Sequence, residues 1–314
     1  MRTRTDGNQR GPVETPSYPQ AQGGPSSKAG KTIRKPWADE PWPLIETPSK
    51  TQNITHPALH IANEMAHTHN AMLRGLNAIY LQAPHVTAAD DDVADLLFLA
   101  RAWSAWALDH HVLKQTAMLP GFEAVLDLEP GALGGGRRDE GEEGRDGEQG
   151  PEEDILTTAL RHVHAYACTT TSSTYDPHAL RALLARLGAL LEPHLRAQIS
   201  VLSGMRELCF CPPPPSRSHP PPSSSQAEHR ANALLRIHAE CIALANDSLD
   251  RPVAAPLILG LRDASYEGGR GADWPRLSVP AVHAVADRLA PRHAGAWRFL
   301  PCDVWGRARG LRGV

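Results

Sequence analysis

Four stretches of the chain carry apolar residues at steps of three and four, and each also carries histidine on the apolar side. Such steps follow one face of an α-helix, so the spacing predicts four amphipathic helices. Two histidines are followed four residues later by glutamine, in the pairs His111 with Gln115 and His194 with Gln198. Residues i and i+4 share a helix face, so each pair should point into one space. Four such helices pack as a bundle with a polar centre.

Capping residues and prolines set the expected ends of these helices. Asp176 suits an N-cap and Pro177 a first turn, whereas Leu119-Pro120 is expected to end the second helix. The second helix should start near Thr87, after which Ala-Ala-Asp follows. The spacing therefore predicts helices over residues 56–80, 87–118, 153–170 and 177–205, with two more over 226–246 and 279–289.

Three segments lack the pattern of a packed core. Residues 1–36 are rich in Pro, Gly, Ser and Gln, which predicts disorder. Residues 131–154 hold eight glycines and nine acids and are expected to form a flexible acidic loop. Residues 209–225 are a Pro/Ser-rich spacer. The expected organisation is an all-α bundle over 37–208 and a helical or irregular C-terminal extension over 226–314 that packs on it.

Composition limits the classes of partner. The formal net charge of −3 gives no overall basic surface for nucleic acid. The five cysteines lack paired spacing, which indicates a reduced, intracellular chain. The N-terminus has no apolar core of a signal peptide, and no window approaches the roughly 18 apolar residues of a membrane span. We expect a cytoplasmic protein that binds neither nucleic acid nor membrane.

Four segments together resemble the hemerythrin-like (HHE cation-binding) domain. They read MAHTHNAMLRGLNAIYLQAP, HHVLKQTAMLPGFE, HVHAY and HLRAQI, and the closing RDASYEGG and WRFLPCDVWG also resemble the tail of such proteins. The resemblance covers about Trp37 to Met205. It implies an up-down four-helix bundle that holds two non-haem irons through histidines and bridging carboxylates. Members of the family bind dioxygen, sense iron or oxygen, or store metal, so iron, another metal ion and dioxygen are the implied ligands.

The resemblance assigns one histidine to each helix. His69 matches the first ligand position and His194 the fourth. On the second helix the match is His111, with its neighbour His110 as the alternative. On the third it is His162, with His164 as the alternative register.

The bridging acids of the family are missing from the matching positions. Gln115 and Gln198 stand where bridging carboxylates are expected, and Lys114 stands where a further acid is common. Two ferrous ions would bring four positive charges into a buried site, where hard iron prefers anionic oxygen ligands and uncompensated charge is costly. A glutamine carbonyl is neutral and a lysine adds a cation. The nearest acids are expected on other helix faces or beyond the bundle centre: Asp109, Glu123 and Glu192.

Three hypotheses about function follow from these residues. The first is an iron- and oxygen-binding hemerythrin-like protein whose di-iron site is weakened or lost. The second is a metal-free scaffold or regulatory module, in which Gln115 and Gln198 hydrogen-bond neutral imidazoles and Lys114 replaces the lost cation. The third, an enzyme with a mononuclear metal, would need a substrate pocket, so a non-enzymatic role is favoured. Trp103 and Trp106 are expected to be core residues.

Overall fold

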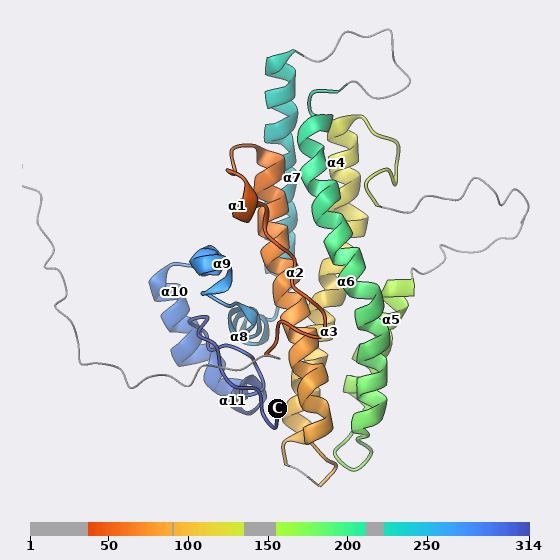
Figure 1. The fold of residues 1–314 in the computed structure, drawn as a ribbon, viewed down its shortest axis with the longest axis vertical. Helices are drawn as coiled ribbons and strands as arrows, with labels where there is room; N and C mark the ends of the chain where they lie inside the picture. The colour runs from red at the N-terminus through yellow and green to blue at the C-terminus, as the bar shows by residue number, and fades with distance from the viewer. Residues whose placement is uncertain (1–36, 90, 135–154, 212–222) are drawn as a thin grey trace, which may run out of the picture. The chain divides into compact units, whose positions relative to one another are not determined.

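The computed structural model describes residues 37–89, 91–134, 155–211 and 223–314 (Figure 1). Every regular element in these ranges is a helix, accompanied by an isolated β-bridge that pairs Cys302 with Ala308. The all-α prediction is therefore confirmed. Within the same ranges, no helix combines the length and the apolar character needed to cross a bilayer.

Several sequence expectations fall on residues outside these ranges. They are the expected disorder of residues 1–36, most of the acidic loop at 131–154 and most of the spacer at 209–225.

Four long helices contact one another through their apolar faces: α2 (Pro57–Gln82), α3 (Val93–Leu113), α5 (Ile155–Thr169) and α6 (Pro177–Leu208). α2 packs mainly on α6 and also on α3, while α5 packs on both α3 and α6 (Figure 1). Each helix contributes fully buried side chains to one apolar core, for example Leu76, Trp103, Leu160 and Leu187. The expected burial of Trp103 and Trp106 is confirmed.

The starts of α2 and α6 follow their capping chemistry, whereas the start of α3 has no side-chain cap. The Asp176 carboxylate accepts a hydrogen bond from the backbone N–H of His178 at 2.8 Å, as expected of an N-cap. At α2 the His56 ring accepts from the N–H of Ala58 at 3.1 Å. The second helix, expected from Thr87, instead begins at Val93.

The second helix also does not end at Leu119-Pro120, so that prediction is wrong. α3 runs into a π turn (Lys114–Met118) and then into α4 (Leu119–Leu126). Leu119 and Pro120 directly follow the π turn, so the missing N–H of Pro120 falls where the helical hydrogen bonds change register. The segment ends at Asp127, which adopts a left-handed conformation with φ of 54°.

The C-terminal part packs helices on the outside of α2 and α3. α7 (Ser224–Ser248) begins with a capping box between Ser223 and Gln226, contacts α2, α3 and α4, and covers the predicted 226–246 helix. α8 (Arg251–Leu261) contacts α2 and α3. α10 (Val279–Ala284) continues into a π turn (Val285–Leu289), as the predicted 279–289 helix requires.

The remaining helical elements are short. They are α1 (Pro48–Thr51), α9 (Tyr266–Gly269), α11 (Ala294–Trp297) and the 3₁₀ turns Ala83–His85, Arg270–Asp273 and Ala290–His293.

Three polar residues of the RGLNAIY region hold the segment before α1 against α2. The Asn70 amide bonds both the N–H and the C=O of Ile45, at 2.7 and 2.8 Å. The Asn77 amide donates to the carbonyl of Ala38 at 2.9 Å. Between them, Arg74 Nε donates to Asp39 at 3.2 Å. Spaced at four and three residues, these side chains share one face of α2, so we call them the α2 polar ladder.

Candidate functional site

His69 lies in the middle of α2 and is 0% exposed. Its Nδ1 is 3.1 Å from the carbonyl oxygen of Leu195 on α6. A carbonyl can only accept, so Nδ1 carries the proton and Nε2 is the unprotonated nitrogen of the neutral ring. His69 Nε2 is buried and has no hydrogen-bond partner.

Three further imidazoles lie around His69. The His110 ring on α3 meets the His69 ring edge-on, with centroids 5.6 Å apart, and its Nε2 is likewise buried without a hydrogen-bond partner. The His111 ring is 5.3 Å from the ring of His194 on α6. We call His69, His110, His111 and His194 the interior histidine cluster. The structure thus brings His69 next to the alternative His110, and His111 next to His194, while their assignment as metal ligands stays a prediction.

Lys114 enters this cluster from the π turn. Its side chain is buried at 1% exposure, donates a hydrogen bond to Gln198 Oε1, and lies with Nζ 3.5 Å from His194 Nε2. His194 and Gln198 thus face the same space, as their spacing predicted.

The matching expectation for His111 and Gln115 stays a prediction. A π turn holds more residues per turn than an α-helix and so breaks the i, i+4 register. Lys114 is buried in the place expected of Gln115, which is only half-buried.

Burial keeps the imidazoles of this region neutral. The pKa values of His69 and His110 lie well below 6.5, first because burial disfavours the charged ring and next because of the Lys114 cation. His238 on α7, close enough to act electrostatically on His110, has its pKa lowered to about 4, chiefly by burial. His69 and His110 are therefore neutral rings beside a lysine.

The third helix contributes no histidine to this cluster. The buried stripe of α5 includes Leu156, Leu160 and Val163 and no histidine. His162 is exposed, and half-buried His164 contacts Ser104 and Cys168. The assigned ligand His162 and its alternative His164 are thus both outside the cluster.

The neighbouring acids have other structural roles. Buried Glu123 accepts from the backbone N–H groups of Gly131 and Leu133 at 3.0 and 2.8 Å, which fixes the turn after α4. Glu192 forms an ion pair with Arg196 at 2.6 Å. Among the residues that the structure describes, no group of three or more His, Cys, Asp or Glu side chains could hold a metal ion. With neutral rings, an amide and an ammonium group, the donor set does not fit a di-iron centre.

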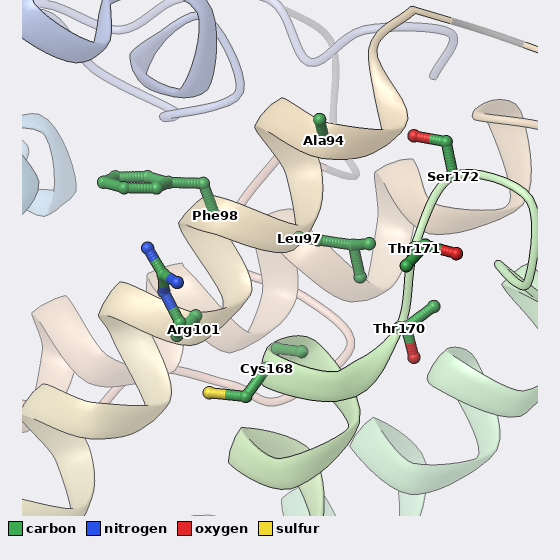
Figure 2. A pocket seen from close by; sticks show the side chains of 9 residues that line it. Ala94, Leu97, Phe98, Arg101, Cys168, Thr170, Thr171 and Ser172 are labelled. Carbon is green, nitrogen blue, oxygen red and sulfur yellow. The ribbon is translucent and has the colours of Figure 1, made fainter.

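A second arrangement, not anticipated from the sequence, lies between α3 and α5. His164 Nδ1 is 3.1 Å from Ser104 Oγ, and His164 Nε2 is 3.4 Å from Cys168 Sγ. Cys168 is exposed and lines a surface pocket of 360 Å³ together with Leu97, Phe98 and Arg101 (Figure 2). The available signal was the i, i+4 spacing of His164 and Cys168 in HVHAYAC.

The chain is similar to one known protein of a biosynthetic gene cluster. Over 291 residues the chain is 26% identical to the dimeric xanthone biosynthesis cluster protein R11 of Cryptosporiopsis sp. (strain 8999), and the match covers 89% of this chain and 94% of that protein. No family model matches the chain, and no solved structure matches it significantly.

Proposed function

We propose that this chain is a hemerythrin-like four-helix protein that works without a di-iron centre, as a metal-free scaffold or regulatory module of a biosynthetic pathway. The observation that carries the proposal is the buried Lys114 ammonium group inside the interior histidine cluster, donating to Gln198 Oε1. The similarity to a protein of a dimeric xanthone biosynthesis cluster supports the biosynthetic setting.

The helix contacts support a hemerythrin-like, up-down topology. Short connections join α2 to α3 and α5 to α6, and the helices of each such pair pack on one another. Short connections between packed helices favour antiparallel neighbours, as in an up-down bundle. The RGLNAIY segment lies on α2, where the α2 polar ladder buries its polar residues.

Electrostatics make the lysine and a pair of irons mutually exclusive. Like charges at close range in a poorly solvated interior repel strongly, so the Lys114 ammonium group disfavours a pair of iron ions at this place. The lysine instead links α3 to α6 through Gln198 and His194. Buried polar contacts of this kind specify one packing arrangement, which suits a module whose role is to present surfaces.

Iron and dioxygen binding is the second candidate, and one observation favours it. His69 Nε2 and His110 Nε2 are both buried and have no hydrogen-bond partner, so two imidazole nitrogens are available to coordinate a metal ion. Under this candidate His69, His110 or His111, and His194 would be the ligands.

An anaerobic Fe(II) titration of the full chain, followed by desalting, exposure to air and metal analysis, separates the two. We expect less than one iron per ten chains and no near-ultraviolet absorbance of an oxo-bridged pair. Retention of two irons per chain would establish the second candidate and overturn the metal-free proposal.

The matched positive control restores carboxylates inside the cluster. Lys114→Glu combined with Gln198→Glu removes the ammonium group and adds two anionic oxygen donors, so this variant should retain more iron than the wild type. Circular dichroism checks that it folds. A folded variant that retains no iron would show that the cluster is not a modified di-iron site.

A further inference from the structure

We propose that Cys168 and His164 form a thiol–imidazole pair that adds the cysteine sulfur to the carbon–carbon double bond of an aromatic α,β-unsaturated carbonyl compound. The pair lies on the outer side of α3 and α5 and shares no side chain with the interior histidine cluster. The inference therefore goes beyond the proposed function and stands independently of whether metal binds.

The hydrogen bonds around Ser104 decide which ring nitrogen of His164 is the base. The Ser104 hydroxyl donates its only proton to the carbonyl of Arg101 at 3.1 Å. Its oxygen therefore accepts from His164 Nδ1–H, which leaves Nε2 unprotonated. That nitrogen is 3.4 Å from Cys168 Sγ and so accepts the thiol proton. Cys168 is thus the nucleophile, His164 the base and Ser104 the group that orients the base. Nucleophilic catalysis requires this set of contacts.

Charged side chains stand near the pair. Burial raises the pKa of Asp109, and an electrostatic interaction with His164 partly lowers it again, so this carboxyl group lies near the His164 ring. Arg101 lines the pocket and supplies a cation on the side of the incoming compound.

The shape and lining of the pocket select the class of compound. The pocket is open to solvent next to Cys168, and its volume of 360 Å³ matches a small molecule. Leu97 and Phe98 provide apolar contact area, and Arg101 Cζ lies 5.1 Å from the Phe98 ring centre. Figure 2 shows Phe98, Arg101 and Cys168 extending to the same side of their helices. A flat apolar ring with a polar carbonyl oxygen fits this combination.

The addition needs no further reactant. His164 Nε2 takes the proton of the Cys168 thiol, and the sulfur lone pair forms a C–S bond to the β-carbon. The carbon–carbon π pair moves to form the enolate, whose oxygen faces Arg101, and the imidazolium returns its proton to the α-carbon. The product is a saturated thioether, and reversal of the same steps releases the compound.

The rate of maleimide addition at each cysteine tests the pair. N-phenylmaleimide and N-methylmaleimide carry the same reactive double bond and differ in the aromatic ring, and peptide mass spectrometry reports each site separately. Cys211 is exposed in the same chain and serves as the internal reference. We expect Cys168 to react at least tenfold faster than Cys211, with a further preference for the phenyl reagent.

Three variants separate the roles of the neighbours. His164→Asn should lower the Cys168 rate to that of Cys211 and leave Cys211 unchanged. Phe98→Leu should remove the phenyl preference while the N-methylmaleimide rate stays. Ser104 is a positioning residue, so Ser104→Ala should lower the Cys168 rate several-fold and shift the ¹⁵N resonances of His164 away from the Nδ1–H tautomer.

Two outcomes would overturn the proposal. One is a Cys168 rate equal to that of Cys211 in the folded wild type. The other is a Cys168 rate that His164→Asn, with an unchanged unfolding midpoint, does not lower. Equal rates for the two maleimides at Cys168 would exclude the aromatic class.

Discussion

α3 supplies side chains to two groups of histidines that differ in almost every physical respect. His110 and His111 lie in the interior histidine cluster with His69 and His194, next to the buried Lys114. Ser104, which is also buried, contacts half-buried His164, whose other ring nitrogen lies 3.4 Å from the exposed thiol of Cys168 at an open pocket. In the first group burial keeps His69 and His110 neutral, whereas the second group has a nucleophile that solvent reaches.

Partners and access, not the histidines themselves, distinguish the two groups. In the interior, Lys114 lies next to Gln198 and His194. On α5, the contact of Ser104 with His164 Nδ1 leaves Nε2 as the proposed base for the Cys168 thiol. Counting histidines along the sequence favours the interior group, whereas the proposed reactive group is the one at Cys168.

The largest expected effect is acid destabilisation through the buried rings. The unfolded chain protonates its histidines below about pH 6.5, whereas folded His238 stays neutral down to about pH 4. The unfolded state therefore binds more protons in this window, so stability is complete above pH 6.5 and falls as the pH decreases. His238 alone should cost about 3 kcal/mol by pH 4, and His69 and His110 act in the same direction. Urea unfolding at a series of pH values from 7.5 to 4.5 measures how the free energy of unfolding depends on pH.

The control for this prediction removes one buried ring. His238→Gln should lower the number of protons taken up on unfolding by close to one between pH 6.5 and 4.5, which makes the free energy of unfolding less dependent on pH. A variant with the wild-type slope would show that His238 is not a source of the acid sensitivity.

A smaller effect is expected from the contact of Lys114 with Gln198. Gln198→Met removes the acceptor oxygen of a hydrogen bond to a buried charge, which should lower the free energy of unfolding by about 1.5–3 kcal/mol. Gln115→Met changes the same residue type one position beyond Lys114, where the side chain is half-buried, and should cost less than about 0.5 kcal/mol. Equal losses in denaturant melts would remove the distinction between the two glutamines.

The smallest effect is expected at the surface of α5. His162 is exposed, so His162→Ala should change the free energy of unfolding by no more than about 0.5 kcal/mol. The same substitution should leave the Cys168 maleimide rate unchanged, because His164 and not His162 contacts the thiol. A large loss of stability would place His162 in the bundle interior after all.

Regular spacing made most of the helices predictable. The stripes of α2, α5 and α6 and the Asp176 cap gave their bounds to within a few residues, because burial and capping depend on local sequence. The π turn at Lys114–Met118 was not predictable, since no sequence periodicity marks where a helix widens. Lys114, the first residue of this turn, is the buried side chain at the interior histidine cluster, whereas Gln115 is only half-buried.

The candidate sites were predictable only in part. His69, His110, His111 and His194 converge because each lies on an apolar stripe that must be buried. His162 does not, because its helix buries the neighbouring Val163 instead. The link from Cys168 through His164 to Ser104 joins residues 60 positions apart on two helices, and spacing along one helix carries no information about such contacts.

The α2 polar ladder holds residues 38–45 and does not reach the histidine cluster. Asn70 and Asn77 bond Ile45 and Ala38, and Arg74 bonds Asp39 and the carbonyl oxygen of Leu261. These contacts depend on how the chain wraps around α2 and not on a bound ion. A sequence search that relies on this motif would therefore collect proteins with the same covering segment, whether or not they hold metal.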